Sequence, residues 1–166
     1  MKNPNNDNAL AWLSVRADGY INIRENIFTN GNQSYHGDVL IGSWNHTVVG
    51  LKTLDGGNIT FYGTVNAYDG CNPAGLWINA DGNVTFREDV GNESALRWLS
   101  VKADNQIRIK DDITTIGNQS YAAPTISLAR HVSLISTDAG AMKLAYDHLY
   151  AHRSDNISSL GGGSLT

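Results

Sequence analysis

Residues 9–35 read ALAWLSVRADGYINIRENIFTNGNQSY, and residues 95–121 read ALRWLSVKADNQIRIKDDITTIGNQSY. The blocks WLSV and GNQSY occur at the same places in both stretches, which are offset by 86 residues. Chance does not supply this many identities, so the chain contains an internal repeat. Repeats of this kind indicate stacked units that each bury their apolar side chains against a neighbouring copy.

A shorter pattern lies inside the long repeat. An apolar residue is followed by a second one two positions later and by a third four positions after that. The first two positions have the period of a β-strand, and the residue between them is polar. We expect the apolar members to form the core: Ile21, Ile23, Ile27, Ile59, Phe61, Val65, Val84, Phe86, Val90, Ile107, Ile109 and Ile113.

Strand-like runs begin near residues 21, 39, 59, 84, 107, 126, 142 and 165, about 20 residues apart. Units this short do not fold alone, and an antiparallel sandwich predicts no recurring pattern of this kind. The sequence therefore predicts an all-β fold, a right-handed parallel β-helix of about seven to eight rungs with about 20–22 residues each. Residues 141–153 are expected to be strand, and Trp12 and Trp98 are expected on one face.

Length and composition favour one domain. We expect a loosely packed polar tail over residues 1–8 and a single β-helix over residues 9–166. The net charge is -4, and the 12 Lys and Arg are scattered singly, so nucleic acid is not expected as a partner. No apolar run is long enough to insert into a membrane. Cys71 is the only cysteine, so no internal disulfide is expected.

The segments GGNITFYGTV, DGNVTFREDV, LSVKADNQIRI and ITTIGNQSY resemble the repeat region of filamentous haemagglutinin-like exoproteins of two-partner secretion and of autotransporter adhesins. The likeness covers about residues 9–166. It implies a β-helix shaft that is exported across a Gram-negative outer membrane and stays at the cell surface or is released. The family's secretion-recognition domain is not recognisable here, so a secretion signal is expected outside this chain.

Seven N-x-S/T sequons begin at Asn32, Asn45, Asn58, Asn83, Asn92, Asn118 and Asn156. Some adhesins that the chain resembles carry sugars on such asparagines. The alternative is that Asn suits the corners of a β-helix and Ser or Thr suits the strand that follows. Asn58 and Asn83 stand at equivalent positions of the short pattern, which favours the structural explanation.

Candidates for chemistry are few. The candidate carboxylates stand in three groups of charged residues: Asp111 with Asp112, Glu25 with Arg24, and Asp89 with Arg87. Their carboxylates could imitate the acid groups of β-helix enzymes that degrade polysaccharides. Charges at repeating positions are more typical of a solvated face. His148 and His152 have a spacing that suits a metal only on a helix. We expect no catalytic residue, no cofactor and no metal. The four tryptophans and seven tyrosines could instead form an aromatic strip for carbohydrate.

The sequence therefore predicts a structural or adhesive shaft segment of a secreted bacterial exoprotein, and the alternative is a β-helix glycan-processing enzyme. Residues 163–166, GSLT, repeat the opening of the rung at residues 57–60 and then stop, which predicts a fragment of a longer shaft. The expected partners are the rest of the parent chain at both ends, a host-cell or glycan receptor, and a second copy bound end to end.

Overall fold

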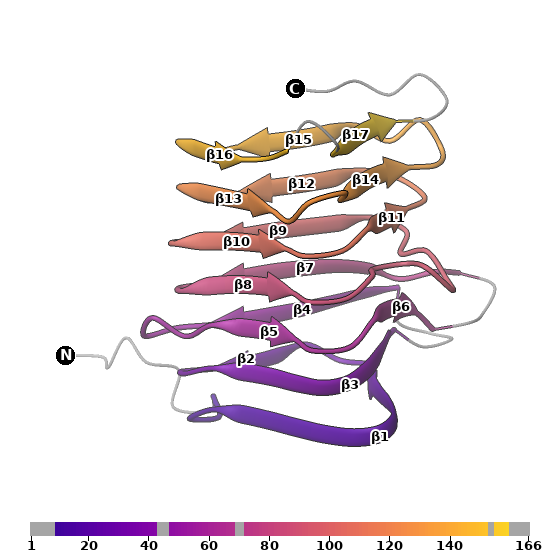
Figure 1. The fold of residues 1–166 in the computed structure, drawn as a ribbon. Helices are drawn as coiled ribbons and strands as arrows, with labels where there is room; N and C mark the ends of the chain where they lie inside the picture. The colour runs from indigo at the N-terminus through magenta and orange to yellow at the C-terminus, as the bar shows by residue number, and fades with distance from the viewer. Residues whose placement is uncertain (1–8, 43–46, 69–71, 153–154, 160–166) are drawn as a thin grey trace.

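The computed structural model describes residues 9–42, 47–68, 72–152 and 155–159. These residues contain no helix, and every pair of neighbouring strands is parallel. The chain winds into a coil of about six turns, with β1 at one end and β15 to β17 at the other, as Figure 1 shows. The predicted parallel β-helix is confirmed.

Each turn passes through three faces in a fixed order. The first face holds the start of β1, the start of β3, and then β5, β8, β10, β13 and β16, and the second holds the ends of β1 and β3, β6, β11, β14 and β17. The third face holds β2, β4, β7, β9, β12 and β15. The strands are β1 (Leu13–Ile23), β2 (Ile27–Thr29), β3 (Gln33–Ile41), β4 (Val48–Thr53), β5 (Ile59–Phe61), β6 (Val65–Ala67), β7 (Gly75–Ala80), β8 (Asn83–Phe86), β9 (Leu99–Ala103), β10 (Gln106–Ile109), β11 (Ile113–Thr115), β12 (Gln119–Ala122), β13 (Thr125–Leu128), β14 (Ser133–Ser136), β15 (Met142–Ala145), β16 (His148–Tyr150) and β17 (Asn156–Ser159).

The core fills the centre of the coil because alternate side chains of every strand point inward. Like side chains stack on successive turns, so that the rings of Tyr35, Phe61 and Phe86 form a column with centroids 5.2 Å apart at each step. Of the twelve expected core positions, all but Ile27 are buried, and Ile27 is partly buried against the core. Residues 141–152 contain β15 and β16, so the prediction of strand was right there, and residue 153 lies outside the described residues.

The rungs vary more in length than expected. Paired residues on adjacent turns are as few as 18 residues apart, as in Ile21 and Val39, and as many as 27, as in Val49 and Leu76. The described coil has about six turns, which place seven strands one after another on the first face; the expected seven to eight rungs include one near residue 165. Strand starts on different faces are closer together than one full turn, which makes the step in the sequence look shorter. The run near residue 165 lies outside the described residues.

The position of Ile21 also differs from the expectation. On the first face Ile59 pairs with Val84, and Val84 pairs with Ile107, as expected. Ile21 instead pairs with Val39, which pairs with Val65, so that Ile21 belongs to the second face. The sequence pattern is the same on different faces, and it therefore cannot tell which face a strand occupies.

The two copies of the long repeat lie on different faces for the same reason. Leu13 is on the first face, where successive pairings lead through Gln33 and Ile59 to Val84. The chain then crosses the second face and reaches Leu99 on the third. One repeat thus advances by three turns and two faces. Trp12 precedes β1 and Trp98 precedes β9, so the expectation that they share a face was wrong.

Candidate functional site

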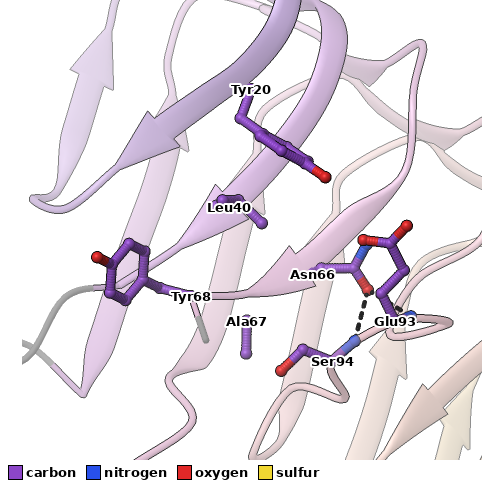
Figure 2. Close-up of a pocket in the computed structure, with 7 residues that line it drawn as sticks. All are labelled: Tyr20, Leu40, Asn66, Ala67, Tyr68, Glu93 and Ser94. Atoms are coloured by element: carbon purple, nitrogen blue, oxygen red, sulfur yellow. Dashed lines mark hydrogen bonds between the residues drawn. The ribbon is translucent and has the colours of Figure 1, made fainter. Parts of the chain in front are cut away.

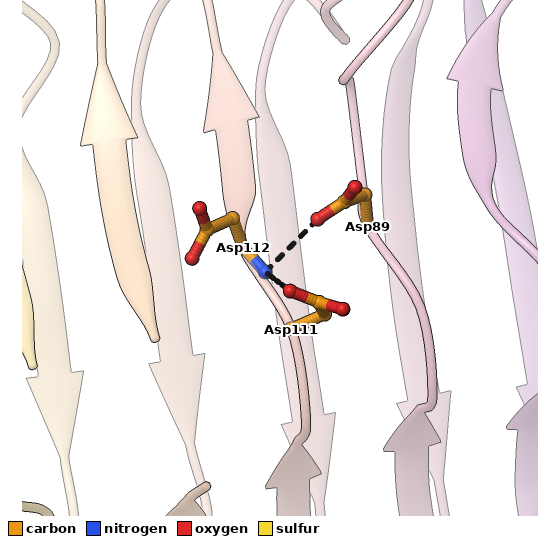
Figure 3. A group of neighbouring side chains, drawn as sticks. All are labelled: Asp89, Asp111 and Asp112. Atoms are coloured by element: carbon orange, nitrogen blue, oxygen red, sulfur yellow. Dashed lines mark hydrogen bonds between the residues drawn. The ribbon is translucent and has the colours of Figure 1, made fainter. Parts of the chain in front are cut away.

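Three carboxylates meet at the corner between the first and second faces (Figure 3). Oxygens of Asp89, Asp111 and Asp112 lie within 4.8 Å of one another. The backbone N–H of Asp112 donates to Asp89 at 3.2 Å and to Asp111 at 3.0 Å. The turns bring Asp89 beside the Asp111–Asp112 pair because Val90 and Ile113 are bridged on adjacent turns. The sequence had named all three, but not as one cluster.

The environment of Asp89 disfavours its charged form. Partial burial raises the pKa of its carboxyl, and the charge of Asp111 raises it further, while the hydrogen bond from the backbone of Asp112 opposes both. A raised carboxyl pKa is a common feature of catalytic sites, and also of structural clusters of like charge. Among the described residues this is the one carboxyl group with a resolved pKa shift.

Hydrogen bonds to the main chain favour a structural role for the carboxylates at this corner. Oδ1 of Asp112 accepts the backbone N–H of Ser133 on the next turn at 2.7 Å. Asp38 does the same on an earlier turn, where it accepts from the backbone N–H of Thr64 at 2.9 Å. Three carboxylates have the donor chemistry that hard divalent cations prefer. Here, however, each of them already accepts a main-chain N–H, as corner residues of the coil do.

The other expected candidates are not brought together. Glu25 follows β1, several turns away from the carboxylate corner. His148 and His152 lie on and just after β16, both exposed, and neither joins a group of metal-ligating side chains in the described part of the chain. Cys71 and the sequon at Asn45 lie outside the described residues.

The asparagines of several sequons form a ladder along a corner. Oδ1 of Asn32 accepts the backbone N–H of Asn58 at 2.8 Å and its Nδ2 at 3.1 Å. Oδ1 of Asn58 accepts both nitrogens of Asn83, each at 2.7 Å. Asn118 accepts in the same way from the backbone N–H of Ala141. The amide nitrogen that would carry a sugar is thus engaged at Asn58 and Asn83. The structural explanation of the seven sequons stays the prediction, with glycosylation as its alternative.

A shallow pocket of about 380 Å³ opens on the second face (Figure 2). It is lined by Tyr20, Leu40, Asn66, Ala67, Tyr68, Glu93 and Ser94. Asn66 is only 1% exposed, and its Oδ1 accepts the backbone N–H groups of Glu93 at 3.1 Å and Ser94 at 3.2 Å. Its Nδ2 donates to Asn92. Because its amide is fully used, Asn66 fixes the loop that forms the pocket wall and is not free to bind a ligand.

Stacking also produces a column of basic and aromatic side chains that sequence reasoning missed. On the outside of the first face, the rings of His36 and Tyr62 stack with centroids 4.0 Å apart, and the guanidinium of Arg87 lies 4.5 Å from the Tyr62 ring. Arg16 pairs with His36 at one end of this column. These residues are scattered singly in the sequence, and only the length of each turn could have shown that they align.

The described residues contain no helix able to cross a membrane. Comparison with known proteins gives no further indication of function, because no family model, no curated protein and no solved structure matches the chain.

Proposed function

We propose that this chain is a shaft segment of a secreted or surface-displayed bacterial exoprotein. Its role is structural and adhesive, and it has no catalytic activity. The observation that carries the proposal is a difference between the two copies of the repeat. In the second copy, Leu99 and Val101 are each 1% exposed, because the strand β7 covers them from the turn before. In the first copy, Leu13 and Val15 are only partly buried.

The edge of the first turn therefore has the apolar character of a surface between turns. A hollow of about 590 Å³ opens there, and its walls include Leu13, Val15, Ile21, Ile27 and Tyr35. Nearby, Leu10 and Trp12 are more than half exposed. Among the described residues no strand pairs with this outer edge of β1, and an unpaired strand edge above an apolar core favours the addition of another strand. A further turn, from the parent chain or from a second copy, would bury this edge as β7 buries its counterpart.

Self-association tests this proposal. Light scattering across a concentration series is expected to show growing end-to-end assemblies. Val15→Lys places a charge on the inward side of the β1 edge and should reduce them, while Ser14→Lys adds the same charge on the outer side and should leave them unchanged. A strictly monomeric protein at all concentrations would contradict the proposal, and so would equal effects of the two variants.

The alternative is a β-helix enzyme that processes glycans, and the raised pKa of Asp89 within the carboxylate corner favours it. A pair of carboxyl groups with separated pKa values is the usual requirement for cleaving a glycosidic bond. Incubation with pectic and host glycans, followed by analysis of the products, distinguishes the two functions. Cleavage by the native protein, lost in Asp89→Asn and Asp111→Asn, would establish the enzyme.

A further inference from the structure

Two tryptophans lie flat against the outside of the third face, each over a glycine of the preceding turn. A β-carbon at Gly50 would stand 2.3 Å from Cε2 of Trp77, and one at Gly75 would stand 2.1 Å from Cε2 of Trp98. Neither glycine has the left-handed backbone conformation that would itself require glycine. These two glycines therefore serve to leave room for the indole rings.

The rings continue into a wider aromatic surface. Gly50 pairs with Trp77, and the pairing of Leu76 with Leu99 places Gly75 opposite Trp98. The ring of Phe28, on β2, lies 6.4 Å from that of Trp77 and is 40% exposed. We name Phe28, Trp77 and Trp98 the aromatic platform. It spans several turns of the third face, and both tryptophan residues remain partly exposed.

Polar side chains border the platform on one side. Phe28 pairs with Lys52, Lys52 with Asn79, and Asn79 with Lys102, so these residues follow one another on successive turns. Ser100 pairs with Trp77 and lies directly beyond it. Amine, amide and hydroxyl donors thus stand next to flat aromatic faces. Lys102 is paired with Asp104 at 3.4 Å, which offsets part of the positive charge.

We propose that the aromatic platform binds a glycan chain. The C–H face of a pyranose ring would stack on the indoles, and its hydroxyl groups would bond to Lys52, Asn79 and Ser100. An added protein strand does not fit there, because β4 and β7 are each paired on both sides. The proposal rests on the proposed adhesive function. It adds which surface binds and which class of ligand is bound.

Affinity electrophoresis in gels that contain a soluble polysaccharide tests the proposal, with β-linked glucan, chitosan derivatives and a polyuronate as the probes. Retardation by at least one probe is expected. Trp77→Ala and Trp98→Ala should each weaken binding by up to about tenfold, the effect of losing one aromatic contact. Gly50→Ala keeps both indoles but displaces the Trp77 ring, and it should also weaken binding.

Two variants serve as matched controls. Trp12→Ala removes an indole that is 67% exposed but outside the platform, and Gly19→Ala adds a methyl group that meets no atom within 4 Å. Both should bind as the native protein does, and circular dichroism should show all variants folded. Failure of every probe, or binding that survives the double replacement of Trp77 and Trp98, would overturn the proposal. Light scattering tests the shaft independently, because Trp77 and Trp98 do not line the hollow at the β1 edge, and Phe28, which does, is left unchanged in these variants.

Discussion

Gln33 and Gln119 make the same hydrogen bonds inside the coil although they lie on different faces. Nε2 of Gln33 donates to Thr29 Oγ1 at 3.2 Å and to a carbonyl of the next turn, that of Lys52, at 2.8 Å. Nε2 of Gln119 donates to Thr115 Oγ1 at 3.1 Å and to the carbonyl of Ile135 at 2.8 Å. Each Oε1 accepts the hydroxyl of the tyrosine two residues on, Tyr35 or Tyr121. In both copies the GNQSY block therefore places a hydrogen-bonded glutamine and tyrosine inside the coil.

Removing the buried amide of Gln119 should lower the stability of the fold. Gln119→Leu keeps the size of the side chain but leaves the Tyr121 hydroxyl and the Ile135 carbonyl without this partner. The Thr115 hydroxyl keeps its bond to the Gly117 carbonyl. Each buried group left unpaired costs about 1–3 kcal/mol, so we expect a loss of at least about 2 kcal/mol in the free energy of unfolding. Urea denaturation measures it. Gln106→Leu, at a half-buried position outside the network, is the control and should change stability little.

The buried tyrosines should make the fold sensitive to alkali. Burial raises the pKa of Tyr35 and of Tyr121 well above the ordinary tyrosine value. Above about pH 10 the unfolded chain releases these protons while the folded chain keeps them, so stability is full below that pH and falls as pH rises. Denaturation at a series of pH values should show this decline. Tyr121→Phe, less stable at neutral pH, should lose stability less steeply; an unchanged slope would refute the assignment.

The inward and outward positions of β10 should differ sharply in how much a substitution lowers the stability of the fold. Ile109 is 1% exposed and Arg108 is exposed on the same strand. Ile109→Asp buries an unpaired charge and should destabilise the protein by several kcal/mol. Arg108→Ala should cost less than about 0.5 kcal/mol. Similar losses for both variants in thermal unfolding would mean that the register of β10 is wrong.

The sequon at Asn58 can be separated from the asparagine itself. Asn58→Ala removes the acceptor for both nitrogens of Asn83 and should cost about 1–2 kcal/mol. Thr60→Val abolishes the sequon but keeps Asn58 and the β-propensity of the site, and it should leave stability nearly unchanged. Intact mass should show protein from a laboratory host to be unmodified, and circular dichroism should show it to be folded. If Thr60→Val made protein from the native host unfold, the sugar would be needed after all.

The sequence was sufficient for the class of fold and for the direction of many side chains. The alternation of Ile107, Arg108 and Ile109 predicts which of them enter the core, because a strand has a period of two. The length of each turn was not predictable in this way, because the corners between strands differ in length. Pairing distances of 18 to 27 residues allow no single period.

The candidate surfaces were less accessible to sequence reasoning. The stacking of Tyr62 on His36 depends on a step of 26 residues that only the pairing of Tyr35 with Phe61 reveals. The burial of Gln33 goes against the ordinary preference of glutamine for the surface. Gly50 and Gly75 look like turn residues in the sequence, whereas they lie within or at the start of strands beneath indole rings.

Because one copy of the long repeat advances by three turns and two of the three faces, the next copy would present the same residues from a different side of the rod. A third copy would take the remaining side, and a fourth would return to the first. An extended array would therefore carry its recurring surface groups along a screw around its axis. A rod of this kind has no front or back, and a partner could engage it from whichever direction it approached.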